Sequence, residues 1–467
     1  MKRGLAGFFV TVAMALAAEI YSTAGQVVPS SSAASQTMET SGASSKSEGG
    51  SNKDWTVDDV VMAEHADSFR ISPDNQWVVW VKHAVDTDKD AGISNLFLSS
   101  LTEKKEIELT RGTDTNSSPK WSRDGRLIAF ISNRPLPKPP KDMPGKPSPT
   151  QIWLINPFGG EPWPLTHSER GVKEFDWLSA DTILVAAEED PSLYERKLEE
   201  GKDNSRAVDD ALHTAPVRLF RIDAKAGQVT RLTSNDDWID ALEVSPDGRK
   251  VVVRHARSLS YEFDQKVPPI AMLRDLKTGE EKRLFTDGRI LPGHVRWAPS
   301  SDGFYITSNY SSDPVYRTAT VQQLYYYDLA EDKAVKVDLG WENELGGGFA
   351  VTPNGFLALL AAGSRYKAAR YTREGEGWAK AWVEGEQANN LFALELGKDG
   401  QTLVYHSSTA SRPDQWYRAR LQGASISNAV QMTELNPGFA NKTAAKSEVV
   451  RWKGALDEEV EGVLYYP

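Results

Sequence analysis

Histidines and acidic residues are the side chains of this 467-residue sequence that could bind a metal ion. Asp86, Asp88 and Asp90 alternate like the start of a calcium-binding loop. Gly92 then comes one residue late, and Phe97 occupies the position of the closing Glu. We therefore expect a solvated acidic loop. The histidines form neither an i, i+4 pair nor a His-x-His pair, so their spacing predicts no metal site. The seven are His65, His83, His167, His213, His255, His294 and His406.

The sequence gives equally little support for other kinds of catalytic or binding site. The absence of cysteine excludes thiolate nucleophiles, disulfides and cysteine metal sites. No glycine-rich loop leads from a strand into a helix, so we expect no nucleotide and no other cofactor. The net charge of −11 gives no counterion release, so nucleic acid is not an expected partner. The tyrosines at 325–327, with Tyr305 and Tyr310, could floor a substrate funnel, but we favour cross-strand packing.

The elements that would position these residues repeat along the chain. The repeat is a short turn phrase followed by a β-rich run. In most copies the phrase consists of a small polar residue, then Pro or a substitute, then Asp or Asn, and then Gly. The copies are ISPDNQWVVWV from Ile71, WSRDGRLIAFI from Trp121, WLSADTILVAA from Trp177, VSPDGRKVVVR from Val244, WAPSSDGFYIT from Trp297, VTPNGFLALLA from Val351 and LGKDGQTLVYH from Leu396. Their acidic or amide residues are 50, 57, 66, 55, 52 and 45 positions apart: Asp74, Asp124, Asp181, Asp247, Asp302, Asn354 and Asp399.

Each copy predicts a β-hairpin, because Pro, Asp and Gly favour a tight turn between strands rich in branched and aromatic residues. A second strand phrase follows most copies, as at Asn95–Leu98, and another strand closes several units on a Leu-Thr pair such as Leu109-Thr110. Two hairpins make one four-stranded blade. We therefore predict an all-β, seven-bladed β-propeller; residues 436–446 would complete an eighth blade in the alternative. A β-sandwich would not repeat one turn phrase seven times.

The N-terminus predicts export. Lys2 and Arg3 precede an apolar run from Leu5 to Ala18. Candidate cleavage sites are Ala15-Leu16-Ala17 near the end of the run and Ser22-Thr23-Ala24 after it. This run is too short to span a bilayer comfortably, so a cleaved signal peptide at 1–24 is favoured over a membrane anchor. Residues 25–53 are rich in Ser, Ala and Gly and predict a flexible linker. We expect a periplasmic or secreted protein with no membrane contact after cleavage.

Two longer steps between copies locate insertions. Pro135–Pro149 predicts an extended, exposed loop, which we favour over a Pro-rich ligand for another domain. Glu188–His213 is highly charged and predicts a short helix or a mobile flap at the edge of a blade. Loops of this kind are where a rigid scaffold places specificity.

The chain resembles a known family in its signal peptide, its acidic lead-in from Trp55 to His65 and its SPDG-type blades. These features are similar to secreted bacterial members of the prolyl oligopeptidase family, in the acylaminoacyl-peptidase and dipeptidyl-peptidase-like branch. The closing phrases LNP from Leu435, EVVRWKG from Glu448 and EGVLYYP from Glu461 look like the passage into that family's α/β-hydrolase domain. The resemblance covers roughly residues 55–467. It implies a propeller at 54–440, followed by a linker and first hydrolase strand at 441–467.

The family's catalytic residues do not carry over to this sequence. The resemblance implies a Ser-Asp-His triad whose serine sits in a G-x-S-x-G turn. Ser44 and Ser425 follow a glycine at the right offset but lack the second glycine. In the family the triad belongs to the hydrolase domain, and the closing strand-like segment here has no evident partner strand. We expect a truncated chain with no catalytic residues, inactive alone, from a serine-type peptidase.

Two functions follow from these observations. In the first, the propeller gates and positions short peptide substrates for a C-terminal hydrolase domain absent from this chain. In the second, it is a free-standing periplasmic propeller, similar to the Tol-system propeller, that acts as a protein-binding scaffold. The sequence leaves open the peptide specificity, the distinction between endopeptidase and exopeptidase, and the oligomeric state.

Overall fold

The computed structural model describes residues 53–137, 149–190, 214–312, 320–385, 387–409, 412–455 and 457–466. These residues form two compact units. The large unit contains Val61–Thr409 and Pro413–Asn436. The small unit contains described residues 53–60, 412 and 437–466. The predicted signal peptide, the linker up to residue 52, and most of the two insertions (138–148 and 191–213) lie outside the described residues.

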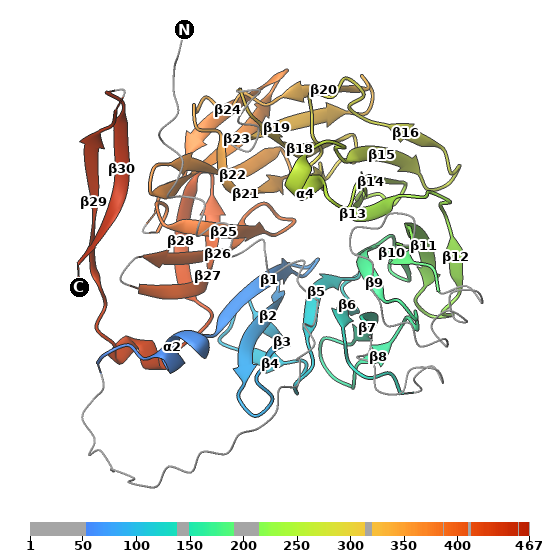
Figure 1. Ribbon diagram of the computed structural model, residues 1–467, viewed down its shortest axis with the longest axis horizontal. Helices are drawn as coiled ribbons and strands as arrows, with labels where there is room; N and C mark the ends of the chain where they lie inside the picture. Colours follow the sequence, from blue (N-terminus) through green and yellow to red (C-terminus); the bar gives the residue numbers. More distant parts are fainter. Residues whose placement is uncertain are drawn as a thin grey trace, which may run out of the picture. The chain divides into compact units, whose positions relative to one another are not determined.

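The described strands of the large unit form seven antiparallel meanders, and each takes its four strands from one continuous stretch of chain (Figure 1). The first three contain β1 (His65–Ile71), β2 (Trp77–Asp86), β3 (Ala91–Ser100) and β4 (Glu106–Glu108); β5 (Asn116–Trp121), β6 (Ile128–Ser132), β7 (Gln151–Ile155) and β8 (Trp163–Pro164); β9 (Val172–Trp177), β10 (Thr182–Glu188), β11 (Val217–Asp223) and β12 (Val229–Arg231).

The remaining four meanders repeat this order. They contain β13 (Trp238–Val244), β14 (Lys250–Ala256), β15 (Ile270–Asp275) and β16 (Glu281–Arg283); β17 (Val295–Trp297), β18 (Gly303–Tyr310), β19 (Val321–Asp328) and β20 (Lys333–Lys336); β21 (Leu345–Thr352), β22 (Gly355–Ala362), β23 (Arg365–Glu374) and β24 (Gly377–Trp382); β25 (Leu391–Leu396), β26 (Thr402–Thr409), β27 (Arg412–Gln422) and β28 (Ser425–Gln431). A short helix, α4 (Tyr261–Asp264), lies between β14 and β15.

The first strands of successive meanders are neighbours around the centre of the large unit. β1 contacts β5, β5 contacts β9, and the series continues through β13, β17 and β21 to β25, which contacts β1 again. This closed order confirms the predicted β-propeller. Residues 436–446, which an eighth blade would need, contain the 3₁₀ helix η1 (Pro437–Asn441) and no strand before Lys446.

The recurring turn phrase works through a serine and an aspartate. Ser72 donates its hydroxyl to Asp74 and accepts the backbone N–H of Trp77 at 3.0 Å. The same two contacts recur around Ser122 and Ser245. Since the serine and aspartate satisfy polar groups within the turn, each of these three copies helps to fix the register of its own hairpin.

The glycine of the phrase serves a second purpose. At Gly248, φ is +71° and an added Cβ would lie 2.8 Å from the carbonyl oxygen of Leu178, in the preceding meander's turn. At Gly400, φ is +65° and the Cβ would lie 2.7 Å from Pro353 Cδ, again in the preceding meander. The glycine therefore allows neighbouring turns to pack closely as well as allowing the left-handed backbone.

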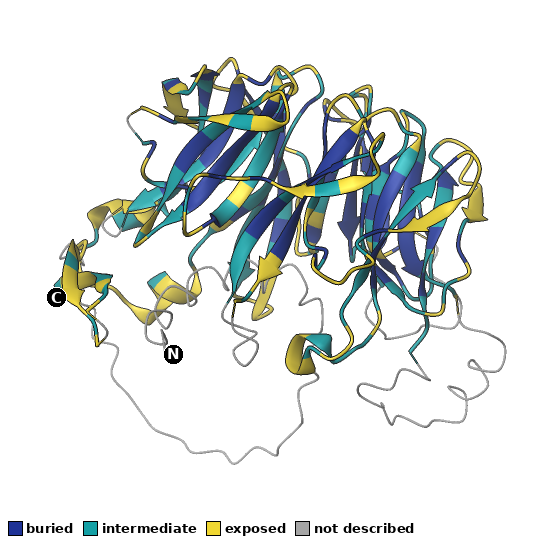
Figure 2. Ribbon diagram, turned by 90° about the horizontal axis from the view of Figure 1, so that it is seen from above, coloured by how far each residue is buried: buried dark blue, intermediate teal, exposed yellow. Residues whose placement is uncertain are grey.

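The hydrophobic core lies between successive sheets (Figure 2). Ala129 and Ile152 of the second meander pack in one buried cluster with Phe175 and Ile183 of the third. The second strand of a meander is covered on both faces: Ile183 to Ala187 of β10 are all buried. This explains why these strands are continuous apolar runs in the sequence and do not alternate.

The first and last meanders meet without sharing a strand, along a contact that we call the seam. Trp416 of β27 stacks on Phe69 of β1, with ring centroids 3.8 Å apart, and donates its indole N–H to the carbonyl oxygen of Ala66 at 2.9 Å. Nearby, Glu64 donates its backbone N–H to Asn436 Oδ1 at 2.7 Å. Side-chain packing and hydrogen bonds therefore close the propeller.

The small unit corrects one sequence expectation. The closing segment β30 (Glu459–Tyr466) is paired along its whole length with β29 (Lys446–Lys453) in an antiparallel hairpin. The prediction that it has no partner strand is therefore wrong. The lead-in helix α2 (Val57–Val61) begins in this unit, where Asp59 forms an ion pair with Lys442 at 2.6 Å. No helix among the described residues is long and apolar enough to cross a membrane.

Candidate functional site

One position of the repeat places a side chain from each meander at the centre of the propeller. It is the residue immediately before each copy of the turn phrase, on the innermost strand. Six of these seven residues are charged: Arg70, Lys120, Asp176, Glu243, Arg296 and Glu395, with Ala350 in the remaining meander. We call the six the charged layer. Three cations thus face three carboxylates where the innermost strands converge.

Ion pairs link members of the charged layer between neighbouring meanders. Arg296 Nη1 lies 3.5 Å from Glu243 Oε2, and Arg70 Nη1 lies 3.7 Å from Glu395 Oε2 across the seam. Lys120 Nζ lies 3.0 Å from Oε1 of Glu174, two residues before Asp176 on β9. Ion pairs therefore bridge neighbouring meanders at three places around the layer.

Tryptophans at the start of the turn phrase bind the backbone of residues in the charged layer. Trp177 donates its indole N–H to the backbone carbonyl of Lys120 at 3.0 Å. Trp297 makes the same bond to the carbonyl of Glu243 at 2.9 Å. Each tryptophan therefore fixes the backbone of a charged residue in the preceding meander. This recurring bond gives a structural reason for tryptophan at the start of the phrase.

Enclosure by the innermost strands shifts the pKa of several members of the layer. Burial raises the pKa of the Glu395 carboxyl, although Arg70 and Arg296 act in the opposite direction. Burial likewise raises the pKa of Glu243, and the neighbouring Asp176 adds to this effect. The Glu243 carboxylate in turn raises the pKa of Arg296. The layer can bind charged ends of a polar ligand, but it contains no hydroxyl or thiol nucleophile.

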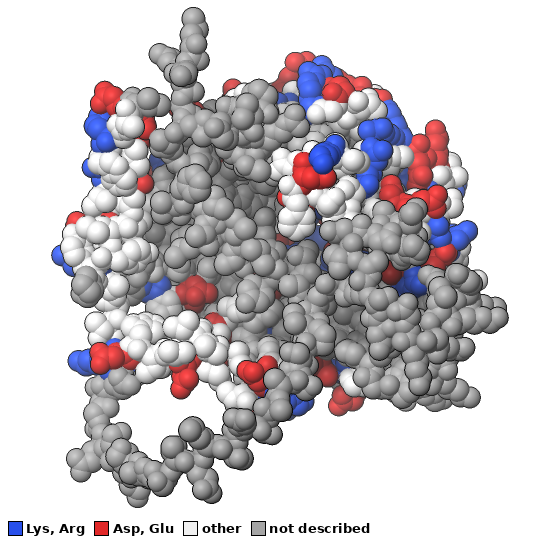
Figure 3. All heavy atoms as spheres, viewed as in Figure 1, with Lys and Arg blue, Asp and Glu red and all other residues white. Residues whose placement is uncertain are grey.

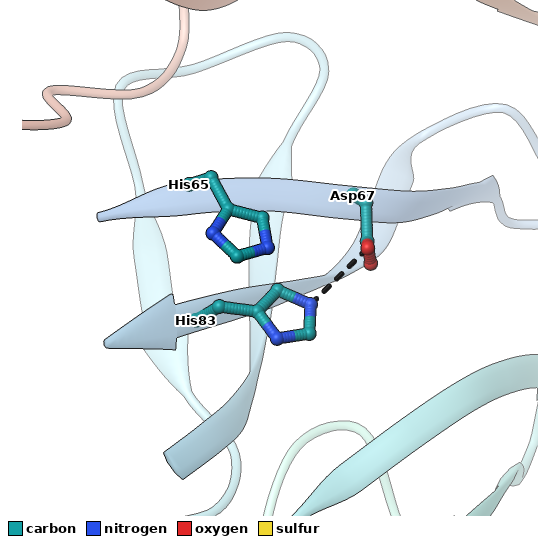
Figure 4. Close-up of side chains that lie close together, drawn as sticks. All are labelled: His65, Asp67 and His83. Atoms are coloured by element: carbon teal, nitrogen blue, oxygen red, sulfur yellow. Dashed lines mark ion pairs between the residues drawn. The ribbon is translucent and has the colours of Figure 1, made fainter. Parts of the chain in front are cut away.

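A second cluster lies near one end of the first meander and combines two imidazoles with a carboxylate (Figure 4). The rings of His65 and His83 are stacked, with centroids 4.2 Å apart and planes inclined by 2°. His83 Nε2 lies 3.2 Å from Asp67 Oδ2. Burial and then the neighbouring His83 lower the pKa of His65. Although burial opposes it, the His83 ring helps to lower the pKa of Asp67.

Sequence spacing could not reveal this cluster. The two histidines are 18 positions apart and become neighbours only because the β1–β2 register pairs His65 directly with His83. Two other histidines also lie beside carboxylates: His255 Nδ1 is 2.7 Å from Asp237, and His406 Nε2 is 3.4 Å from Asp414.

Some of the remaining sequence candidates have structural roles. Tyr326 and Tyr305 are buried and directly paired across β18 and β19, which confirms the cross-strand packing interpretation for these two, whereas Tyr310 is 45% exposed. Asp86 accepts backbone N–H bonds from Asp88 and Lys89 and shapes the turn between β2 and β3. Ser425 is exposed at the start of β28. Ser44 lies outside the described residues.

The visible outer rim of the large unit shows no dominant charge. In Figure 3, acidic and basic side chains are interspersed over β16 and β20. Several of these charges are paired, as in the contacts of Lys282 with Asp332 and of Arg274 with Glu281.

The known proteins that the chain resembles include several peptidases. No family model matches the chain. The peptidase YuxL of Bacillus subtilis (strain 168) is 26% identical over 210 residues, which are 42% of this chain. The acylaminoacyl peptidase of Pyrococcus horikoshii covers 86% of the chain with a TM-score of 0.59 and 14% identity. The propeller domain of the trilobed protease from Pyrococcus furiosus, which has an open velcro topology, covers 80% with a TM-score of 0.51 and 12% identity.

The chain resembles the propeller part of a prolyl oligopeptidase-family peptidase. This confirms the resemblance seen in the sequence, and the solved neighbours show the propeller fold itself. The chain spans 30% of the length of the Bacillus peptidase and 58% of the length of the Pyrococcus horikoshii enzyme. It spans 97% of the isolated Pyrococcus furiosus propeller domain.

Proposed function

We propose that this chain is the propeller part of an exported serine peptidase, and that it restricts and positions short peptides for a hydrolase domain. The observation that carries this proposal is the match of the chain to the acylaminoacyl peptidase fold over 86% of its residues. The sequence likeness to a Bacillus peptidase supports the same class. The catalytic serine would belong to the hydrolase domain, since the sequence has no G-x-S-x-G.

The charged layer supports a gating role. Its cations and carboxylates face one another at the centre, so an extended chain passing there would have to displace ion pairs such as Arg296–Glu243. The layer would oppose passage of a folded protein or a long apolar peptide, because burying unpaired charges is unfavourable. A short peptide has charged ends close together, and these ends can replace the broken contacts.

The β29–β30 hairpin supports the presence of a partner domain in the proposal. Its exposed apolar side chains are too many for a two-stranded hairpin that faces only water. They are Val449, Trp452, Val463, Leu464 and Tyr465, with exposed fractions of 38–50%. We propose that the hydrolase domain covers them.

Reading the gene beyond codon 467 tests the proposal directly. We expect an open frame that encodes G-x-S-x-G within the next few hundred codons, and an encoded protein that reacts with a fluorophosphonate probe. The 467-residue chain should neither react with the probe nor hydrolyse an aminoacyl-nitroanilide. A stop codon after Pro467, or a probe-reactive 467-residue chain, would contradict the proposal.

The gating role has a separate test in the full-length protein. Changing both Arg296 and Glu243 to Ala should raise the hydrolysis rate of long peptides relative to dipeptide substrates. The matched control changes Arg254 and Asp240, an ion pair at 2.8 Å that forms no part of the layer, to Ala. An unchanged ratio of long to short substrates would refute gating at the layer and leave the peptidase assignment intact.

A further inference from the structure

The β1–β2 register gathers three metal-ligating side chains on one face of the first meander. His65 and His83 are directly opposite each other in the antiparallel pair, and Asp67 follows His65 by two residues. Residues two apart on a strand point to the same face, and directly opposed residues have adjacent Cβ atoms. Figure 4 shows the two rings and the carboxylate side by side. No helix or loop rearrangement is needed to bring the three together.

The donor atoms lie close enough to converge on one transition-metal ion after a side-chain rotation. One ligand atom from each of the three side chains lies within 4.8 Å of the other two. Tetrahedral zinc has metal–ligand bonds of about 2.0–2.2 Å, which places its donor atoms roughly 3.3–3.5 Å apart. Because the stacked rings have planes inclined by only 2°, their in-plane lone pairs do not converge, and the His65 ring must rotate about its side-chain bonds to bind the same ion. Two imidazoles and one carboxylate are a common donor set for Zn²⁺ and leave the fourth position open for water or another ligand.

The surrounding charges favour a cation. A second carboxylate, Asp414 of β27, acts electrostatically on His65 and lies 3.4 Å from His406 Nε2. Together with Asp67 it offsets the two positive charges of a divalent ion. The adjacent cation Lys82 is already paired with Glu64 at 2.6 Å. Asp414 also places the cluster beside the seam, because β27 belongs to the last meander.

The ligand atoms of two of the three side chains are already in contact. His83 Nε2 has almost no solvent-exposed surface and lies 3.2 Å from the Asp67 carboxylate as an ion pair. A divalent ion that replaces the proton between the imidazole and the carboxylate would be held by both groups.

We propose that His65, Asp67 and His83 bind one divalent transition-metal ion of the Zn²⁺ class, at the seam end of the first meander. The site is independent of the charged layer and of any hydrolase chemistry. An ion there would be a structural or regulatory ligand of the propeller.

Calorimetric titration of the 467-residue chain with ZnCl₂ at pH 7.5 tests the site, using protein purified without a polyhistidine tag. We expect one equivalent of Zn²⁺ to bind, and His83→Ala and Asp67→Asn each to weaken binding at least tenfold. Co²⁺ should give a visible absorption band characteristic of low coordination number in the wild type, but not in His83→Ala or Asp67→Asn. Because the chain has no cysteine, thiolate ligands cannot contribute to the band.

The matched control is His167→Ala, which removes an exposed histidine outside the cluster. It should leave Zn²⁺ affinity unchanged. Each variant is also melted without metal, and if His83→Ala does not fold, His65→Gln on the exposed side of the cluster replaces it. Zn²⁺ should raise the melting temperature of the wild type and His167→Ala but not of the folded cluster variant. Equal Zn²⁺ affinity in wild type and cluster variants, or an equal loss in His167→Ala, would overturn the proposal.

Discussion

Each charged side chain at the centre of the propeller is held by partners from a different part of the chain. Arg296 is an example, because it pairs with Glu243 of the preceding meander and is influenced by Glu395 and Asp176. Removing one such cation leaves the negative charge of several carboxylates less well balanced, which lowers stability. Solvent screening reduces this loss of stability, since 43% of the Arg296 side chain is exposed.

Replacing Arg296 by Met keeps the aliphatic stem and removes the charge. We expect Arg296→Met to lower the free energy of unfolding by about 1–2 kcal/mol, between the values for exposed and buried ion pairs. The matched control is Arg249→Met, because the Arg249 side chain is 81% exposed. It should change stability by no more than about 0.5 kcal/mol. Denaturant unfolding of both variants provides the measurement, and equal effects would contradict a stabilising role for the ion pair.

Asp275 provides a prediction about pH. Backbone N–H bonds from Thr278 and Lys277 lower its pKa to about 2. A carboxyl whose folded pKa is depressed stabilises the protein above its unfolded pKa, and that contribution is lost as pH falls through the folded pKa. Wild type should therefore be more stable than Asp275→Asn at pH 6, with a difference that narrows between about pH 4 and pH 2.

Urea unfolding at a series of pH values measures this difference. Asp88→Asn is the control, since Asp88 is exposed in the turn between β2 and β3. Its difference from wild type should change little over the same range. A wild-type advantage over Asp275→Asn that grows on acidification would contradict the assigned bonds.

The two central features of the site differ in how far sequence could predict them. The charged layer is visible once the copies are aligned, because its residues all precede the same phrase, as Lys120 precedes Trp121. Which side chains pair across it depends on closure of the propeller and is not encoded locally. The His65–His83 pair depends on strand register across 18 residues, which spacing rules for helices and short loops do not address.

At the scale of elements, the turn phrase sets the contact between meanders as well as the hairpin itself. Gly248 and Gly227 have nearly the same φ, +71° and +66°. A Cβ on Gly248 would meet the Leu178 carbonyl at 2.8 Å, whereas a Cβ on Gly227 would have no atom within 4 Å. The pair therefore separates the contribution of backbone conformation from that of close packing.

We expect Gly227→Ala to destabilise the protein by about 1–2 kcal/mol, the usual cost of a left-handed backbone for alanine. Gly248→Ala should be worse by a further 1–3 kcal/mol or so, because the methyl group forces the neighbouring turn away. Thermal or urea unfolding of the two variants gives the comparison. Equal destabilisation would show that the close approach is unimportant.

Elements within the repeat were predicted well because their signals are local. The phrase at Ile71 and the strand phrase at Asn95–Leu98 both became strand segments of the first meander. The hairpin of β29 and β30 was missed, because its two strands follow no turn phrase of the repeated kind. A strand outside the periodic pattern can be recognised in sequence, but its partner cannot.

At the scale of the molecule, the seam differs from the other junctions between meanders. Its two sheets, the first and the last, are neighbours in space but do not follow each other in the sequence. Trp416 is its central side chain, 6% exposed, stacked on Phe69 and bonded to Ala66. Its surroundings form one buried cluster drawn from the first and last meanders.

Trp416→Ala should lower the free energy of unfolding by about 3–5 kcal/mol, as expected for loss of a buried tryptophan. Backbone amide hydrogen exchange should accelerate most in β1 and β27, which form the seam. It should accelerate less in β10, which belongs to the third meander, away from the seam. Trp163→Ala is the control, because Trp163 is 41% exposed on the outermost strand β8. Uniform acceleration across all meanders would contradict a locally weakened seam.

The continuous origin of each meander also has a consequence for folding. Because β1 to β4 pair only with one another, the first sheet can form while the last meander is still being synthesised. Strand pairing within a meander closes short loops and is fast, whereas the contact of Trp416 with Phe69 joins residues 347 positions apart. Each new sheet can dock on its predecessor in order, and closure of the circle is then the final and slowest event.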